Sequence, residues 1–130
     1  MPVLDASVMV EMLSLGQHRE VAEARILAQE RAFWAPDLLD AEVGSSLRKV
    51  VRHGEMSADQ AARSLWELQK LPIHRVSSER LTQFAWLLRD NVSFYDGLYV
   101  ALAQLLEQPL LTFDRRLARA GLDVEVEVLA

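Results

Sequence analysis

The chain alternates short apolar runs with longer stretches in which apolar residues recur at helical spacing. The short runs predict strands, and they are Pro2–Leu4, Ala32–Ala35, Ile73–Val76, Leu110–Phe113 and Val124–Val128. The longer stretches predict helices over residues 6–14, 18–30, 36–53, 57–71, 78–89 and 94–107, and a last short helix between Asp114 and Gly121. Because helices separate the strands, we expect parallel pairing and an α/β sandwich.

Two helix starts and one strand carry more specific signals. Pro36 is placed to open the third helix, and Ser57 with Gln60 matches a capping box at the start of the fourth. The run Val124–Val128 alternates strictly between valine and glutamate. That pattern predicts a strand with one solvated face, and therefore an edge of the sheet.

Length and composition fit one globular domain over residues 1–130. Of the 130 residues, 51% are hydrophobic and 25% are charged, which is enough for a core without a metal or disulfide staple. The absence of cysteine excludes a disulfide framework, a thiolate zinc site and a cysteine nucleophile. No apolar run approaches the ~18 residues that span a bilayer, and the start lacks the basic region of a secretion signal. We therefore expect a cytoplasmic protein that does not contact membranes.

The charge balance limits the choice of partner. A formal net charge of −5 disfavours nucleic acid, because phosphate binding requires a positive field. Since Lys49 and Lys70 are the only lysines, 12 of the 14 basic residues are arginine. Arginine contacts phosphate through two parallel hydrogen bonds, so a local arginine surface on an acidic protein stays open.

Four acidic residues lie at positions where the predicted elements favour chemistry. Asp5 directly follows the first strand, and Asp114 directly follows the fourth. Asp96 lies in the first turn of the most apolar helix, and Glu42 lies on a polar stripe of the third helix that also contains Lys49. Each acid alone also has a structural explanation, because Asp5 and Asp114 can cap helices, Ser93 and Asp96 match a capping box, and a glutamate on a polar stripe is commonly only solvated.

The placement of these acids favours a metal site. Ligands of open α/β sheets bind outside the carboxyl ends of the strands, where the acids that follow strands converge. Converging carboxylates must either become protonated or bind cations. Oxygen donors without histidine or cysteine suit Mg²⁺ or Mn²⁺, and such ions engage phosphates and help to form a hydroxide nucleophile. With no P-loop and no Ser–His–Asp set, metal-assisted phosphodiester hydrolysis fits the residues best.

Four short motifs follow one another along the chain: VLDAS at residues 3–7, PDLLDAE at 36–42, YDGLYVALA at 95–103 and LTFDRRL at 111–117. In their order and spacing, across essentially the whole chain, they resemble the PIN-domain ribonucleases, and specifically the VapC-type toxins of type II toxin–antitoxin pairs. The resemblance implies a three-layer α/β sandwich whose central, mostly parallel sheet has about five strands in the order 3-2-1-4-5.

The resemblance also implies a function. It predicts a Mg²⁺- or Mn²⁺-dependent endoribonuclease that hydrolyses RNA with metal-activated water, forms a homodimer and is silenced by a cognate antitoxin protein. The implied catalytic and metal-binding residues are Asp5, Glu42, Asp96 and Asp114, with Ser7 and Thr112 as supporting hydroxyls. Two alternatives stay open: a PIN-like nuclease with another RNA- or DNA-processing role, and a PIN-like module that binds without catalysis.

Three arginines follow Asp114 closely: Arg115, Arg116 and Arg119. They are placed to contact substrate phosphate, although a solvated helix face explains them equally well. Arg116 stands where many relatives carry another acid, which leaves open whether one or two metal ions bind.

Overall fold

Each predicted strand and helix is present in the computed structural model, which describes residues 1–130. The strands are β1 (Val3–Leu4), β2 (Phe33–Pro36), β3 (Ile73–Val76), β4 (Leu110–Thr112) and β5 (Val126–Val128). The helices are α1 (Ala6–Leu13), α2 (Arg19–Leu27), α3 (Leu38–Arg52), α4 (Ala58–Lys70), α5 (Thr82–Leu87), α6 (Phe94–Leu106) and α7 (Arg115–Ala118), with a 3-10 turn η1 (Ser78–Leu81) before α5. None of the helices combines the length and apolarity needed to cross a bilayer.

The five strands form one parallel sheet in the order β3-β2-β1-β4-β5, which confirms the expected topology. The chain builds the sheet outward from β1 to β3, and then returns to place β4 on the other side of β1. This reversal creates a crevice at the carboxyl ends of β1 and β4, where open α/β sheets bind ligands. Asp5 and Asp114 follow these two strands directly or after one residue.

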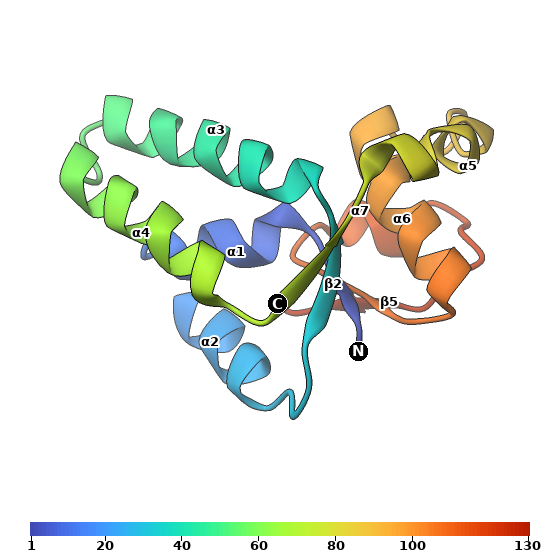
Figure 1. Cartoon of the computed structure of the whole chain (residues 1–130), viewed down its shortest axis with the longest axis horizontal. Coiled ribbons are helices and arrows are strands. Elements are labelled where there is room, and N and C mark those ends of the chain that lie inside the picture. Colours follow the sequence, from blue (N-terminus) through green and yellow to red (C-terminus); the bar gives the residue numbers. More distant parts are fainter.

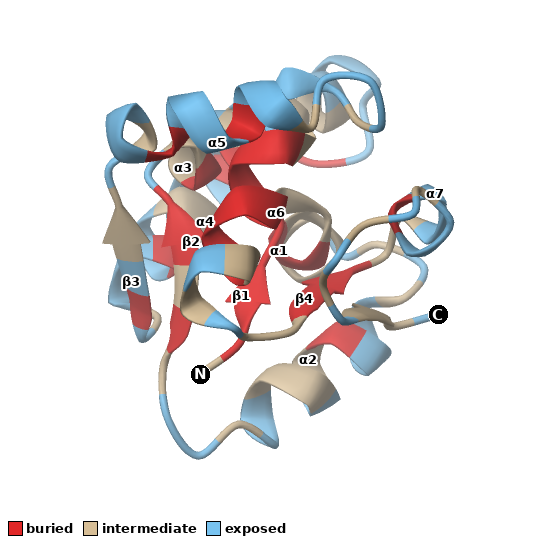
Figure 2. Cartoon of the chain, turned by 90° about the vertical axis from the view of Figure 1, so that its right-hand side faces the viewer, coloured by how far each residue is buried: buried red, intermediate tan, exposed pale blue.

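Helices cover both faces of the sheet. Figure 1 shows α1–α4 on one side of the strands and α5 and α6 on the other. Buried residues concentrate along β1, β2 and β4 and in the middle of α6, where every residue from Gly97 to Ala103 is buried (Figure 2). At Gly97 an added Cβ would lie 3.2 Å from the carbonyl oxygen of Ala85. Glycine therefore lets α6 pack closely against α5.

The predicted elements differ most from the structure at Pro36 and over residues 78–89, and each difference has a local cause. Pro36 does not open α3 but ends β2, where it lies opposite Val76. Since proline has no N–H with which to extend the pairing to β1, the strand ends there and Asp37 becomes the helix N-cap. The helix predicted over residues 78–89 divides into η1 and α5. At the junction the Thr82 hydroxyl donates to the carbonyl of Glu79 (3.0 Å), a local bond that competes with regular helix.

Other local predictions are confirmed. The capping box at the start of α4 forms both of its bonds, from Gln60 N–H to the Ser57 hydroxyl and from Ser57 N–H to the Gln60 side chain. β5 is an edge strand, because it pairs with β4 alone. Its three residues are all half-buried, so the alternation in sequence does not become an alternation in burial.

Candidate active site

The ends of β1 and β4 are tied together by a buried hydrogen-bond network around Asp5. The Asp5 carboxylate accepts bonds from the backbone N–H of Ser7 (3.0 Å) and from the hydroxyls of Ser7 and Thr112 (2.5 Å each). The same hydroxyls accept in turn, Ser7 from the N–H of Phe113 (2.9 Å) and Thr112 from the N–H of Asp114 (2.9 Å). The side chain of one acid thereby fixes the register of two strand ends.

Asp5 and Asp114, the acids at the strand ends, both cap helices, and this role is compatible with a role in a metal site. Asp5 is the N-cap of α1 through its bond from Ser7 N–H, and Asp114 is the N-cap of α7 through its bond from Arg116 N–H (2.9 Å). A carboxylate has about four acceptor positions, and a cap uses one. Capping therefore orients these acids without excluding a ligand.

Asp96 is positioned by the start of α6. The Ser93 hydroxyl accepts the backbone N–H of Asp96 (3.1 Å), so Ser93 caps the helix as predicted. The return bond, from the Ser93 N–H to the Asp96 carboxylate, is not formed, because aspartate is shorter than the glutamate or glutamine of a full capping box. The predicted box is therefore only half present, and the carboxylate stays available to the site.

Glu42 is held by a residue that the sequence alone did not single out. The phenol of Tyr99 donates to Glu42 Oε1 across 2.6 Å, and Tyr99 is only 2% exposed. Burial, followed by the bond to Glu42, raises the pKa of Tyr99, so it remains a proton-carrying donor. Tyr99 lies three residues after Asp96 and therefore on the same face of α6, which is the spacing that would have identified it.

The structure brings the four predicted acids into one electrostatic cluster, with Asp96 at its centre. Burial is the largest cause of a raised pKa at Asp5, Glu42 and Asp96, and it carries the pKa of Asp5 to about 6. The charge of Asp96 raises the pKa of Asp5 and Glu42 further, and the charge of Asp114 does the same to Asp96. The cluster is thus short of positive charge at its buried end.

At the exposed end, Arg116 supplies that charge. Its Nε and Nη2 donate to the two carboxylate oxygens of Asp114 (3.0 and 2.7 Å), and this pairing lowers the pKa of Asp114. Of the other arginines expected near substrate, Arg115 donates to the carbonyl of Ala130 (3.0 Å), and Arg119 is exposed without an ion pair.

The donor set suits a hard cation, although it does not form a closed cage. No three histidine or acidic side chains are grouped closely enough to ligate one ion together. Mg²⁺ commonly takes only one or two carboxylates directly and keeps several water molecules. Buried carboxylates that repel one another, with oxygen donors alone, therefore fit an ion held partly through water.

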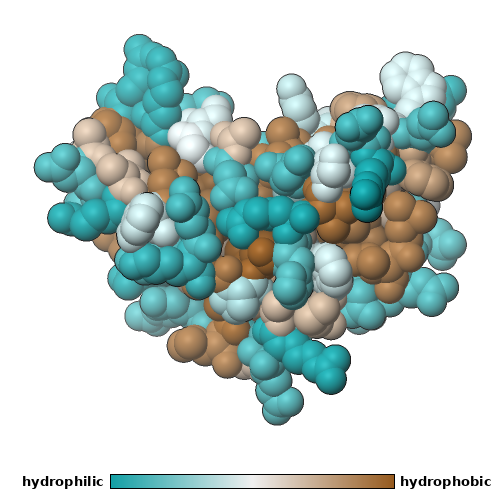
Figure 3. Space-filling view, viewed as in Figure 1, coloured by the Kyte–Doolittle hydropathy of each residue, from teal (hydrophilic) through white to brown (hydrophobic).

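Two open hollows flank the acid cluster. One, of about 530 Å³, is lined by Asp96, Asp114, Arg116 and neighbouring residues of 89–93 and 117–120. The other, of about 360 Å³, contains Glu42 and Tyr95. In the surface view a broad notch opens at the top of the molecule, between the α3–α4 side and the α5 side (Figure 3). Glu42 is therefore accessible from solvent on one side of the cluster and Asp96 and Asp114 on the other, whereas Asp5 lines neither hollow.

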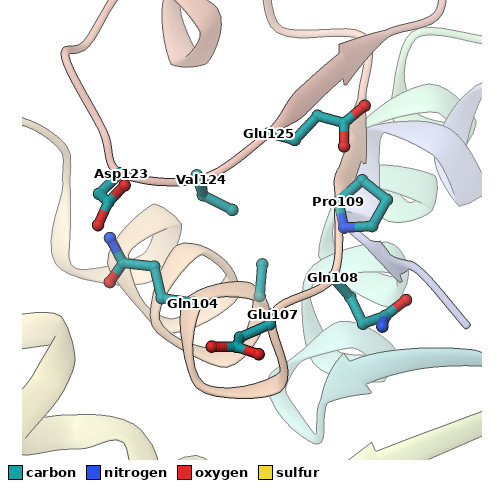
Figure 4. Close-up of a pocket in the computed structure, with 8 residues that line it drawn as sticks. Gln104, Glu107, Gln108, Pro109, Asp123, Val124 and Glu125 are labelled. Atoms are coloured by element: carbon teal, nitrogen blue, oxygen red, sulfur yellow. The ribbon is translucent and has the colours of Figure 1, made fainter.

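A further hollow lies at the opposite end of the sheet. It is lined by Pro109 and Glu125, which precede β4 and β5, and by Glu107 and Asp123 (Figure 4). Because it faces the amino ends of the strands, it is separate from the four acids. Its three carboxylates would repel a phosphate, so it is not part of the candidate site.

Comparisons with known proteins agree with this geometry. The model of the PIN domain family matches residues 3–122. Ribonuclease VapC1 of Mycobacterium tuberculosis is 46% identical over 129 residues, which cover 98% of this chain and 96% of that protein. Ribonuclease VapC3 of the same organism is 40% identical over 118 residues, covering 91% and 85%.

Solved structures share the fold at lower identity. The crystal structure of M. tuberculosis VapC20, described as a Sarcin-Ricin loop cleaving toxin, has a TM-score of 0.73 at 15% identity and covers 94% of this chain and 96% of its own. VapBC2 from Rickettsia felis, solved with a DNA fragment from its promoter, has a TM-score of 0.69 at 14% identity, covering 96% of each chain.

Proposed function

Because this chain belongs to the PIN-domain family, and within it to the VapC ribonucleases, we propose that it is an endoribonuclease acting as the toxin of a toxin–antitoxin pair, with Mg²⁺ or Mn²⁺ as cofactor. The observation that carries the proposal is Asp5, a carboxylate 7% exposed at the strand switch point, with a pKa raised to about 6. Strongly perturbed acids in an accessible cleft are typical of functional sites.

The proposed roles of the acidic residues follow from their surroundings. Asp5 and Asp96 are the acids that would hold the ion, because they interact with each other and lack a cationic partner of their own in direct contact. When bound, the ion would polarise the phosphate and lower the pKa of a water molecule. Ser7 and Thr112 keep the Asp5 carboxylate oriented, since both of its oxygens accept their hydroxyls.

Glu42 is suited to accept a proton from the attacking water. Tyr99 fixes one oxygen of Glu42 and leaves the other free, and burial raises the pKa of Glu42, which makes its carboxylate a stronger base. We also propose that Arg119, exposed at the carboxyl end of α7, contacts a phosphate of the substrate outside the hollow that contains Asp114.

The partners follow from the same proposal. We propose RNA as the substrate, a cognate antitoxin as the inhibitor, self-association into a homodimer and a cytoplasmic location. The curated relatives are ribonucleases, and one structural neighbour is VapBC2, bound to a fragment of its promoter DNA. Light scattering of the purified protein measures the oligomeric state directly.

A cleavage assay with controlled metal tests the proposed function. The purified chain, stripped with chelator, is incubated with a single-stranded oligoribonucleotide and with the matching oligodeoxyribonucleotide, with and without Mg²⁺ or Mn²⁺. We expect internal cleavage of RNA that requires the ion and returns when excess metal is added after chelation. Cleavage of DNA alone would favour another PIN-like nuclease, and RNA binding without cleavage at any metal concentration would favour a non-catalytic module.

A further inference from the structure

We infer that the hollow beside Glu42 is a nucleotide subsite, in which one RNA base stacks on Tyr95 and an adjoining phosphate meets Lys49. We call it the α3 hollow, and its lining consists of Leu38, Ala41, Glu42, Ser45, Ser46, Lys49 and Tyr95. The inference rests on the proposed function and adds to it a place where the substrate next to the cleaved bond is held.

The α3 hollow opens directly onto the acid cluster. Glu42 belongs to both, because it is one of the four acids and itself lines the hollow. Tyr95 lines the hollow from the other side and directly precedes Asp96 in the first turn of α6. A nucleotide adjoining a phosphate at the acids would therefore reach this hollow first on the α3 side.

The lining has the chemistry that recognises a nucleotide. Tyr95 is 60% exposed, whereas Tyr99, one turn further along α6, is buried at 2%. An exposed aromatic ring in an open hollow offers a flat face on which a base stacks, and such stacking tolerates any base. With a volume of about 360 Å³ and two serine hydroxyls in its wall, the hollow has room and hydrogen-bonding groups for the sugar as well.

Lys49 provides the positive charge. It lies seven residues after Glu42, on the same face of α3 and roughly 10 Å further along the helix axis. Lys49 is exposed and takes part in none of the five ion pairs of the molecule. On a chain of net charge −5, a free ammonium beside a carboxylate cluster draws a phosphate backbone to that side.

The hollow on the other side of the acids lacks this combination. There Arg116 is bonded to Asp114, and Arg89 donates to the carbonyl of Trp86 (3.0 Å) with its guanidinium 5.0 Å from the Trp86 ring centre. Both cations already have partners within the chain. The α3 hollow is therefore the one in which a free cation and an exposed ring face the acids together.

RNA binding and cleavage kinetics of matched variants test the inference. Tyr95→Ala and Lys49→Ala are compared with Trp66→Ala and Lys70→Ala on α4, where Trp66 is also 60% exposed and Lys70 lies 5.5 Å from its ring centre. Binding of a fluorescent single-stranded oligoribonucleotide is measured by anisotropy in chelator, where no cleavage occurs. kcat and KM are measured separately with Mn²⁺.

We expect Tyr95→Ala to weaken RNA binding by at least about five-fold, the lower end of what one stacked base contributes, while Tyr95→Phe binds as the wild type does. Lys49→Ala should reduce the steepness of the plot of log binding constant against log salt concentration by about 0.7, which is the contribution of one phosphate on a single strand. KM should rise with little change in kcat, and both α4 variants should match the wild type.

Unchanged binding and KM in both Tyr95→Ala and Lys49→Ala, with an active wild type, would overturn the inference and leave the proposed function intact. A wild type that neither binds nor cleaves RNA overturns both. If Tyr95→Ala instead weakens only the binding of the antitoxin, the α3 hollow is a protein-docking site and the inference is wrong.

Discussion

Asp5 and Asp114 follow neighbouring parallel strands, yet their surroundings are opposite. Asp5 is 7% exposed, accepts bonds only from hydroxyls and one backbone N–H, and has a pKa raised to about 6 by burial. Asp114 is half-buried, is bonded at both oxygens by the guanidinium of Arg116, and has a lowered pKa. One end of the acid cluster lacks a counter-charge, and the other has one from its own chain.

The difference indicates where a bound cation stabilises the folded protein most. A buried carboxylate without a cation raises the free energy of the folded state, because its charge is poorly solvated. A dication near Asp5 relieves that cost, whereas at Asp114 it must compete with a guanidinium already in place. We therefore expect Asp5 to govern activity and the pH dependence of stability, and the Asp114 side to adjust metal affinity by smaller amounts.

Replacement of the buried acid should have the largest effect. Asp5→Asn keeps the size of the side chain and one acceptor oxygen, but it removes the charge and replaces the second oxygen with an amide donor. We expect metal-dependent RNA cleavage to fall by about 10²–10³-fold, the loss typical of removing one group that stabilises the transition state, with an unchanged circular dichroism spectrum.

Asp123→Asn is the matched control, because it changes an exposed aspartate in the hollow at the opposite end of the sheet. It should leave cleavage unchanged. Wild-type activity in Asp5→Asn would contradict the role of Asp5 in the site.

The pH dependence of stability should sharpen the contrast. The pKa of Asp5 is raised from 3.8 to about 6 in the folded protein, so the folded state holds its proton more tightly than the unfolded chain does. The bound proton therefore stabilises the folded state. This stabilisation is fully present below about pH 4 and is lost as the pH rises through about 6, which lowers the free energy of unfolding by roughly 3 kcal/mol. Glu42 and Asp96, whose pKa values are also raised, act in the same direction.

Urea unfolding of the metal-free wild type and Asp5→Asn at a series of pH values measures this. As the pH rises from about 4 to about 7, the wild type should lose more of its free energy of unfolding than Asp5→Asn does. Mn²⁺ should restore the wild type at the upper end and have less effect on the variant. A constant difference between the two proteins across this range would rule out an uncompensated Asp5 carboxylate.

Removal of the Tyr99 hydroxyl should have an intermediate effect. Tyr99→Phe deletes the donor to Glu42, and since that bond lowers the pKa of Glu42, its loss should raise the pKa further. We expect kcat/KM to fall by about 10- to 100-fold, as for other groups that orient a metal-site residue, and the acidic limb of its pH profile to move to higher pH.

The pH profile separates this role from a structural one. In a Glu42→Gln background, Tyr99→Phe should no longer move the acidic limb, because the titrating carboxylate is absent. A limb that stays in place in the single variant would indicate that Tyr99 only packs against α3.

The contrast between the two acids also shows what the sequence could predict. The positions of Asp5, Asp96 and Asp114 followed from strand and helix ends, because parallel strands end at one edge of a sheet. The bond from Tyr99 to Glu42 was missed, since a tyrosine in a nearly all-apolar helix has the pattern of a core residue. Its partner is 57 positions away, and periodicity along a chain does not encode which distant groups meet.

Local geometry limited the prediction in a second way. The motif around Arg116 placed it near Asp114, but the sequence left a solvated face and a phosphate contact equally open. In the structure Arg116 instead pairs with Asp114, because its rotamer brings two guanidinium nitrogens onto the carboxylate. The sequence does not encode that rotamer. Pro36 was similarly ambiguous, because proline suits both the first turn of a helix and the end of a strand.

Removal of Arg116 should have the smallest effect, because it alters the exposed end of the acid cluster, at Asp114. The Arg116 side chain is 86% exposed, and exposed ion pairs contribute little in water. Arg116→Ala nevertheless frees Oδ2 of Asp114, leaves Oδ1 bonded only to the backbone N–H of residue 116, and removes a positive charge that also acts on Asp96. We expect the metal-free variant to bind Mn²⁺ about two- to five-fold more tightly, measured by electron paramagnetic resonance of the free ion. Arg119→Ala, which removes an arginine without an ion pair from the other end of α7, should bind Mn²⁺ as the wild type does. Equal or weaker Mn²⁺ binding in Arg116→Ala would mean that Asp114 lies outside the reach of the ion, and that the buried half of the cluster binds it alone.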